Sequence, residues 1–192
     1  YSRFSDLIRN EFPYQTFLEL CMDYRSMGMK EEAIQILSKA PEHPLVNIWK
    51  AYLQQDASAL TSATTASADF VFPFRQETIS ALEWATSKNS HWKFKYYLAL
   101  NYWAVQREAE AIRLFQACGD DPDYAPFYLT RVQMLEAHNK EPLKDIETAQ
   151  RLTPEQWRTW SYLIAYYENI KAYKKALRTS ENAYKKFSSN YT

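Results

Sequence analysis

The sequence repeats itself at a fixed internal spacing, and this feature constrains the fold more than any other. Four apolar or small residues recur in three copies, with gaps of 4, 9 and 7 residues between them. The copies are Leu20, Tyr24, Ala33 and Ala40; Leu98, Tyr102, Ala111 and Cys118; and Leu163, Tyr167, Ala176 and Ala183. Such self-similarity predicts a chain built from stacked, similar units.

The spacing itself predicts a helix–turn–helix unit. A gap of four places the Leu and the Tyr of each copy on one face of a first helix. The Ala that follows nine residues later lies early in a second helix, where only a small side chain lets the two helices cross closely. The last small residue is about two turns further along the same face. The residue after the Leu is Cys21, Ala99 or Ile164, of which the first two are small and Ile164 departs from the pattern.

The composition supports an all-α fold. Glycine occurs only twice, at Gly28 and Gly119, whereas aromatic residues make up 16% of the 192 residues. Two glycines cannot supply the phosphate loops of a Rossmann or P-loop protein, or the tight turns of an all-β protein.

This pattern resembles the tetratricopeptide repeat (TPR), a helix–turn–helix unit of about 34 residues. The turn SMGMKEEA, which carries Gly28, is similar to the family's usual turn, while AVQREAEA and NIKAYKKA lack glycine but keep its length and polarity. The resemblance implies an all-α, right-handed, antiparallel helix–turn–helix solenoid of about five units in a single array over 1–192. The expected units are 14–45, 45–88 (degenerate, with an insertion), 92–123, 123–154 (degenerate) and 157–188.

The two degenerate units are expected from the intervals between the clear copies. The later one predicts helices over 124–137 and 143–152, joined by the turn HNKEP, and the earlier one predicts helices over 45–54 and 76–87. Between the latter two, ASALTSATTASAD is either a short, tightly packed helix or a flexible connection. The following Phe70-Val-Phe-Pro-Phe-Arg75 is interpreted as a hydrophobic staple before a helix, with Arg75 either buried or snorkelling. A short helix over Ser2–Asn10 is expected to cap the start.

A second resemblance covers residues 70–128, about a third of the chain. The marks FPFR, LEWA, YYLAL and the EA of the next helix are similar to a segment of large bacterial proteins that join a β-sandwich domain of unknown function to a TPR array. The resemblance implies that this chain is the repeat portion of such a protein. An accessory role in a larger carbohydrate-handling enzyme follows as an alternative function, by analogy alone.

No catalytic, cofactor-binding or metal-binding motif is recognisable. Cys21 and Cys118 belong to no CxxC pair and are expected to be core thiols, with a disulfide between them the alternative. The acidic stretch CGDDPD (118–123) is either a metal loop or a helix end followed by an N-cap, and the second interpretation fits its residues better. The three histidines have no partner at motif spacing, so we predict no enzyme, no cofactor and no metal.

The predicted function is a non-enzymatic scaffold that binds a protein or peptide in the concave groove of the solenoid. Aromatic and Arg side chains on the first helices, off the core stripe, are the expected groove residues; some of them could instead be buried between repeats. They are Lys93, Tyr96, Leu100, Trp103, Tyr124, Phe127, Tyr128, Arg131, Arg158, Tyr162 and Glu168. The TPR subfamily that grips chaperone C-terminal carboxylates has Lys and Asn where this chain has Leu18, Met22, Tyr96 and Leu100, which argues against that function.

The expected partner is a protein or peptide, or the rest of the chain's own polypeptide, and self-association is a further interpretation. A formal net charge of zero argues against nucleic acid, and no apolar run approaches the roughly 18 residues of a membrane span. The last helix carries Lys171, Lys174, Lys175, Arg178, Lys185 and Lys186 against Glu181, as either a solvated cap or a footprint for an anionic partner. Because the chain begins with Tyr1, it is expected to be a fragment or a processed chain, from the cytoplasm or the periplasm.

Overall fold

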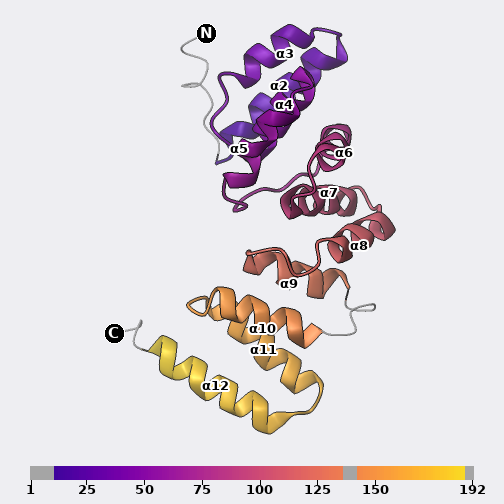
Figure 1. Ribbon diagram of the computed structural model, residues 1–192. Coiled ribbons are helices and arrows are strands. Elements are labelled where there is room, and N and C mark those ends of the chain that lie inside the picture. Colours follow the sequence, from indigo (N-terminus) through magenta and orange to yellow (C-terminus); the bar gives the residue numbers. More distant parts are fainter. Residues whose placement is uncertain (1–10, 136–141, 189–192) are drawn as a thin grey trace. The chain divides into compact units, whose positions relative to one another are not determined.

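The computed structural model describes residues 11–135 and 142–188, and within these ranges it contains helices and no strand (Figure 1). The predicted cap over Ser2–Asn10 lies outside the described residues, as does most of the predicted turn HNKEP. The helices are α2 (Pro13–Ser26), α3 (Lys30–Leu37), α4 (Pro44–Gln54), the 3-10 helix η1 (Ala57–Ala59), α5 (Leu60–Thr65), α6 (Thr78–Lys88), α7 (Trp92–Ala104), α8 (Glu108–Ala117), α9 (Ala125–Met134), α10 (Pro142–Leu152), α11 (Trp157–Asn169) and α12 (Tyr173–Phe187).

Each helix packs mainly against its neighbours in the sequence. The most extensive contacts join α2 with α3, α7 with α8, α9 with α10, and α11 with α12. These contacts divide the chain into two compact units, Tyr1–Asp120 and Asp121–Thr192. In the first unit α3 contacts α4, α4 contacts α6, and α6 contacts α7; in the second, α10 contacts α11. Packing between sequence neighbours is typical of a repeat architecture.

The small residue of the second helix is the most uniformly buried position of the repeat. Ala33, Ala111 and Ala176 are all at most 5% exposed, as the spacing predicts. The two thiols are also in the core: Cys21 and Cys118 are free and buried, which confirms the prediction of core thiols and excludes a disulfide between them. Burial raises the pKa of the Cys21 thiol to about 12, so this sulfur stays protonated and unreactive.

The three clear copies share one turn geometry, although only one of them has a glycine there. Gly28, Gln106 and Lys171 occupy the same place in the repeat, and all three have a positive φ, of 79°, 63° and 57°. In each copy the residue after this position donates its backbone N–H to the carbonyl of the repeat tyrosine, at 2.8–2.9 Å. These bonds close the end of the first helix in a Schellman-like motif. The turn geometry is therefore common to the three copies and does not depend on a glycine.

The degenerate segments are also helical. The helices expected at 45–54, 76–87 and 143–152 are present as α4, α6 and α10 with small shifts in their ends, and the helix expected at 124–137 is α9, which ends at Met134. The Ala/Ser/Thr-rich stretch forms η1 and α5, so its interpretation as a short helix is confirmed. Asp56 caps η1 by accepting the backbone N–H of Ser58 at 2.9 Å.

The turn geometry yields a prediction about glycine. Replacing Gln106 by Gly removes the cost of a left-handed conformation, so we expect the free energy of unfolding to rise by about 0.5–1 kcal/mol. The reverse change, Gly28→Ala, places a Cβ at φ +79° and is expected to lower it by about 1 kcal/mol, although no atom lies within 4 Å of that Cβ. Urea denaturation followed by circular dichroism measures both. Equal effects of the same sign at the two positions would contradict this account.

Candidate functional site

An extended segment between α5 and α6 exposes three phenylalanines on one edge. Phe70, Phe72 and Phe74 are 67%, 55% and 46% exposed, whereas the alternating Val71 and Pro73 are buried. This alternation is that of a strand with one buried face. We refer to residues Phe70–Arg75 as the aromatic segment.

Polar contacts fix both ends of the aromatic segment to the helices of the first unit. The Tyr14 hydroxyl on α2 donates to the carbonyl oxygen of Phe70 at 3.3 Å. At the other end the fully buried Asn101 on α7 donates its Nδ2 to the carbonyl oxygen of Arg75 at 3.1 Å. Phe70 has a φ of +58°, a conformation that a non-glycine residue keeps only where its surroundings hold it. These contacts hold the segment in place, so the three rings are kept at the surface.

Two hollows lie between this segment and α2. The first holds about 300 Å³ of open space and is lined mainly by apolar side chains, among them Leu18, Met22, Phe72 and Phe74. The second, next to it, is lined by Glu19, Met22, Asp23, Arg75 and Glu77. Arg75 forms an ion pair with Glu19 across the boundary between them. The pair of hollows thus combines an apolar floor with a rim of three carboxylates and one guanidinium.

The interpretation of this segment as a hydrophobic staple was wrong. A staple buries its large side chains, but here the small Val71 and Pro73 are buried and the large rings point outward. Arg75 is neither buried nor simply snorkelling, because its side chain remains 43% exposed while it pairs with Glu19. The signal in the sequence was the period-2 alternation with a proline on the inner face.

His43 links the aromatic segment to the start of α4. Its Nδ1 accepts the backbone N–H of Leu45 at 3.2 Å and so caps the helix. The imidazole stacks on Tyr14, with ring centroids 3.5 Å apart and planes 9° apart. Burial lowers the pKa of His43 to about 4, so the ring is neutral at physiological pH.

Five of the eleven predicted groove residues are buried, so these five do not lie on an exposed surface as predicted. Their exposed fractions are all below 10%: Lys93, Tyr96, Phe127, Tyr128 and Arg131. These side chains serve internal packing. Tyr96 lies against the ring of Phe115 on α8, and the Tyr128 hydroxyl donates to the carbonyl oxygen of Pro122 at 2.8 Å. The sequence did not reveal which aromatic residues of a first helix point outward, because α7 and α9 carry apolar residues on most of their sides.

The two buried cations each satisfy a specific structural need. Lys93 Nζ donates to the carbonyl oxygens of Thr64 and Ala66, both at 2.6 Å, and thereby caps the end of α5. Arg131 on α9 pairs with Asp145 on α10 through two contacts, Nε–Oδ2 at 2.8 Å and a second from its terminal nitrogen to Oδ1. This bidentate pair joins the two helices in the interior of the second unit, with both side chains less than 10% exposed.

The other six predicted residues remain accessible. In the first unit Trp103 is 42% exposed and Leu100 is half-buried; in the second, Arg158 and Glu168 are exposed. Tyr124 and Tyr162 are half-buried, and the Tyr162 hydroxyl accepts a hydrogen bond from Gln133 on α9. None of them belongs to the two hollows beside the aromatic segment.

The stretch CGDDPD follows α8, with Cys118 at the C-cap and Gly119 at a φ of +58°. This confirms the helix end predicted from the sequence. The predicted N-cap is wrong, because the N-cap position of α9 is Tyr124 and no side chain caps that helix. Among the described residues, no group of three or more His, Cys, Asp and Glu side chains has a geometry that could hold a metal ion. In the same part of the chain, no helix is both long enough and apolar enough to cross a bilayer.

Comparison with solved structures shows the fold. A crystal structure of MamA protein matches with a TM-score of 0.54 at 13% identity, over 93% of this chain and 94% of that one. MamA 41-end from Desulfovibrio magneticus RS-1 matches with a TM-score of 0.52 at 14% identity, over 94% and 98%. A putative kinesin light chain from Podosopora anserina with nearly identical TPR-like repeats gives a TM-score of 0.47 at 15% identity, over 95% and 99%.

No family model matches the sequence, and no curated protein matches it either. The all-α, TPR-like solenoid class predicted from the repeat is confirmed by the structural neighbours. The resemblance of residues 70–128 to large bacterial proteins with a β-sandwich domain stays a prediction.

The buried pair Arg131–Asp145 yields a stability prediction. Asp145→Asn leaves the guanidinium buried without its counter-charge, so we expect the free energy of unfolding to fall by about 3–5 kcal/mol. The matched control is Glu110→Gln, which removes the exposed pair of Arg107 and Glu110 at 3.0 Å and is expected to cost less than about 1 kcal/mol. Urea denaturation of both variants tests the difference. Similar small losses would show that the buried pair does not hold α9 on α10.

His43 yields a prediction about pH. Above pH 6.5 the ring is neutral in both states and its full contribution to stability is present. As the pH falls from 6.5 toward 4 the unfolded chain takes up a proton that the folded chain does not, so stability decreases. Because the ring is partly accessible, we expect a loss of about 1–2 kcal/mol. The variant His43→Asn keeps an oxygen that can cap the helix but has no group that titrates in this range. Its free energy of unfolding should therefore fall less between pH 6.5 and 4 than that of the wild type. The same fall in both proteins would contradict the assignment to His43.

Proposed function

We propose that this chain is a non-enzymatic module that binds a protein or peptide, and that the aromatic segment with its two hollows is the binding surface. The observation that carries the proposal is the exposure of Phe70, Phe72 and Phe74 on a segment pinned at both ends. Exposed aromatic side chains on a rigid support are the residues that dominate interface energetics. A TPR-like fold, which presents such surfaces on stacked helices, supports the same conclusion.

The chemistry of the surface specifies the kind of peptide. The rings project from alternate residues of an extended segment, so they match alternate side chains of an extended peptide. The first hollow is lined mainly by apolar side chains, among them Leu18, Met22, Phe72 and Phe74, and this lining favours an apolar side chain. The carboxylates of Glu19, Asp23 and Glu77 beside it favour a neighbouring Lys or Arg. We therefore propose a ligand with an apolar residue next to a basic one.

The accessible residues of the predicted groove remain candidates for partner contacts, each within its own unit. They are Leu100 and Trp103 in the first unit and Tyr124, Arg158, Tyr162 and Glu168 in the second. An accessory role in a carbohydrate-handling enzyme would use exposed aromatic rings differently, by stacking on sugar faces. Binding of the chain to immobilised glycans, with no selected peptide, would favour that alternative.

Peptide selection on the intact chain tests the proposal. Peptides displayed on phage and selected on the wild-type chain should share an apolar residue beside Lys or Arg. Phe72→Ser combined with Phe74→Ser should weaken their binding by about tenfold or more in fluorescence anisotropy, since each lost ring contact contributes about 1 kcal/mol. Asp23→Asn with Glu77→Gln should reduce the preference for the basic residue while keeping the apolar one.

The control is Trp157→Ser, which removes an aromatic side chain that is 66% exposed in the second unit. It should leave the selected peptides bound with the wild-type affinity. Because all the replaced phenylalanines are exposed, the variants should keep the helical circular dichroism of the parent. Peptides that bind equally well to the doubly substituted chain would contradict the assignment of this surface.

A further inference from the structure

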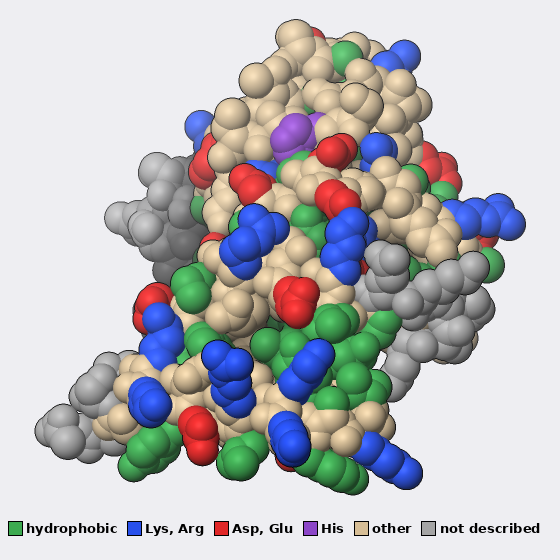
Figure 2. Space-filling view, turned by 60° about the horizontal axis from the view of Figure 1, so that its bottom comes forward, with side chains coloured by type: hydrophobic (Ala, Val, Ile, Leu, Met, Phe, Trp, Pro, Cys, Tyr) green, Lys and Arg blue, Asp and Glu red, His purple; other side chains and the backbone are tan. Residues whose placement is uncertain are grey.

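The last helix leaves a second apolar surface uncovered. Ile170, Tyr173, Leu177 and Tyr184 are 52%, 64%, 63% and 75% exposed. Their spacing of three, four and seven residues places them on one side of α12 and of the turn before it. We call these four residues the α12 stripe. Figure 2 shows apolar side chains among Lys and Arg side chains on this face of the molecule.

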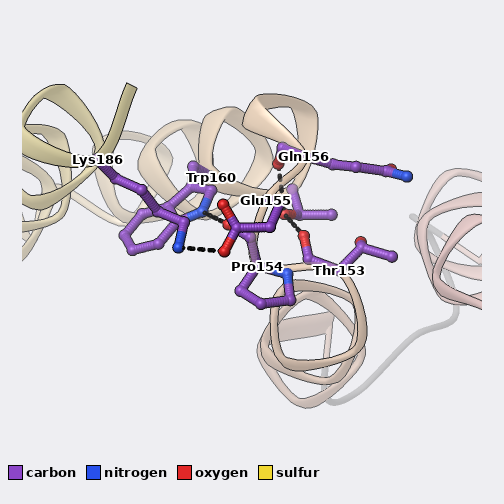
Figure 3. Close-up of polar contacts among 7 residues, drawn as sticks. Thr153, Pro154, Glu155, Gln156, Trp160 and Lys186 are labelled. Carbon is purple, nitrogen blue, oxygen red and sulfur yellow. Dashed lines mark hydrogen bonds and ion pairs between the residues drawn. The ribbon is translucent and has the colours of Figure 1, made fainter. Parts of the chain in front are cut away.

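Other side chains of α12 attach the helix to the rest of the second unit. Ala176 is buried in the contact with α11. At the far end Lys186 Nζ pairs with Glu155 Oε1 at 2.6 Å, and the Trp160 Nε1 donates to the Pro154 carbonyl oxygen at 2.8 Å (Figure 3). The Trp160 ring also packs edge-on against Phe187. The helix is thus held near both ends, while the side chains of the stripe remain exposed.

Comparison of the repeats shows how the equivalent positions are covered. Leu177 follows the buried alanine of its repeat, as Ile34 follows Ala33, and it lies six residues before Ala183, as Leu143 lies six before Ala149. Ile34 and Leu143 are half-buried, whereas Leu177 is 63% exposed. Met27, the equivalent of Ile170 in the first copy, is exposed there too, so Leu177 is the stripe residue whose equivalents are more covered elsewhere in this chain.

The charges around the stripe select among possible occupants. Lys174, Arg178 and Lys185 lie beside it on the outer surface of α12, with Glu181 as the one carboxylate of the helix. If two copies of the chain packed stripe to stripe, these cations would face one another and repel. An amphipathic helix with Asp or Glu beside its apolar face would pair with them instead.

We propose that the α12 stripe is a docking surface for an amphipathic helix of another protein, whose apolar residues are flanked by carboxylates. This surface belongs to the second unit and involves none of the residues of the aromatic segment. It gives the positive charge of the last helix a role in choosing the partner.

Two synthetic helical peptides of about four turns test this inference. Both carry Leu along one face; one has Glu and the other Lys at the flanking positions. In fluorescence anisotropy with the full chain, the Glu peptide should bind at least about tenfold more tightly than the Lys peptide at low salt. Leu177→Ser with Tyr184→Ser should reduce that binding by about tenfold or more, and Lys174→Glu with Arg178→Glu should reverse the preference.

The matched control is Met27→Ser, which removes an apolar side chain that is 63% exposed in the first unit and should change neither affinity. All replaced side chains are exposed, so unchanged circular dichroism and melting temperature should accompany each variant. If neither peptide binds, or if binding survives the change at Leu177 and Tyr184, the inference is wrong. It is also overturned if sedimentation shows concentration-dependent self-association that the same two substitutions abolish, because a second copy would then be the occupant.

Discussion

The close crossing of two helices at a small side chain is the contact on which each repeat of this structure depends. Ala33, Ala111 and Ala176 are the buried positions common to the three clear copies, and each lies where a second helix meets the first. A larger residue there would push the pair apart and displace the faces that receive the next helix. Because α3 contacts α4 and α10 contacts α11, this steric requirement extends within each unit beyond a single helix pair.

The fold was predictable because a small side chain is needed where the helices cross, and this need appears in the sequence as a regular spacing of small residues. The gaps of 4, 9 and 7 residues identified the helix pairs, and even the turns without glycine follow the same geometry, as Gln106 and Lys171 show. The candidate site was not predictable in the same way. The segment with Phe70, Phe72 and Phe74 was interpreted as a staple although its period-2 alternation already indicated one exposed face. Tyr96 and Tyr128 were expected outside because they lie off the core stripe, but ring contacts and a tertiary hydrogen bond, which the repeat spacing does not encode, bury them.

Buried polar side chains fix parts of the structure that the repeat spacing does not specify. Asn101 fixes the carbonyl of Arg75, Lys93 caps α5, and Arg131 binds Asp145 across two helices. Arg131 and Asp145 pair where both side chains are buried, and an unpaired charge there would be costly. Together these contacts attach the segment between α5 and α6 to α7 and join α9 to α10.

The aromatic segment lies between the two helices that pack as one pair, α4 and α6, yet it contributes only Val71 and Pro73 to the buried core. Its three outward side chains are thus more exposed than the residues that pack between the helices. Substitutions at those positions are therefore expected to cost less stability than substitutions at the buried Val71 or Pro73. In this arrangement the surface chemistry of a six-residue stretch can change with little effect on the helices that carry it.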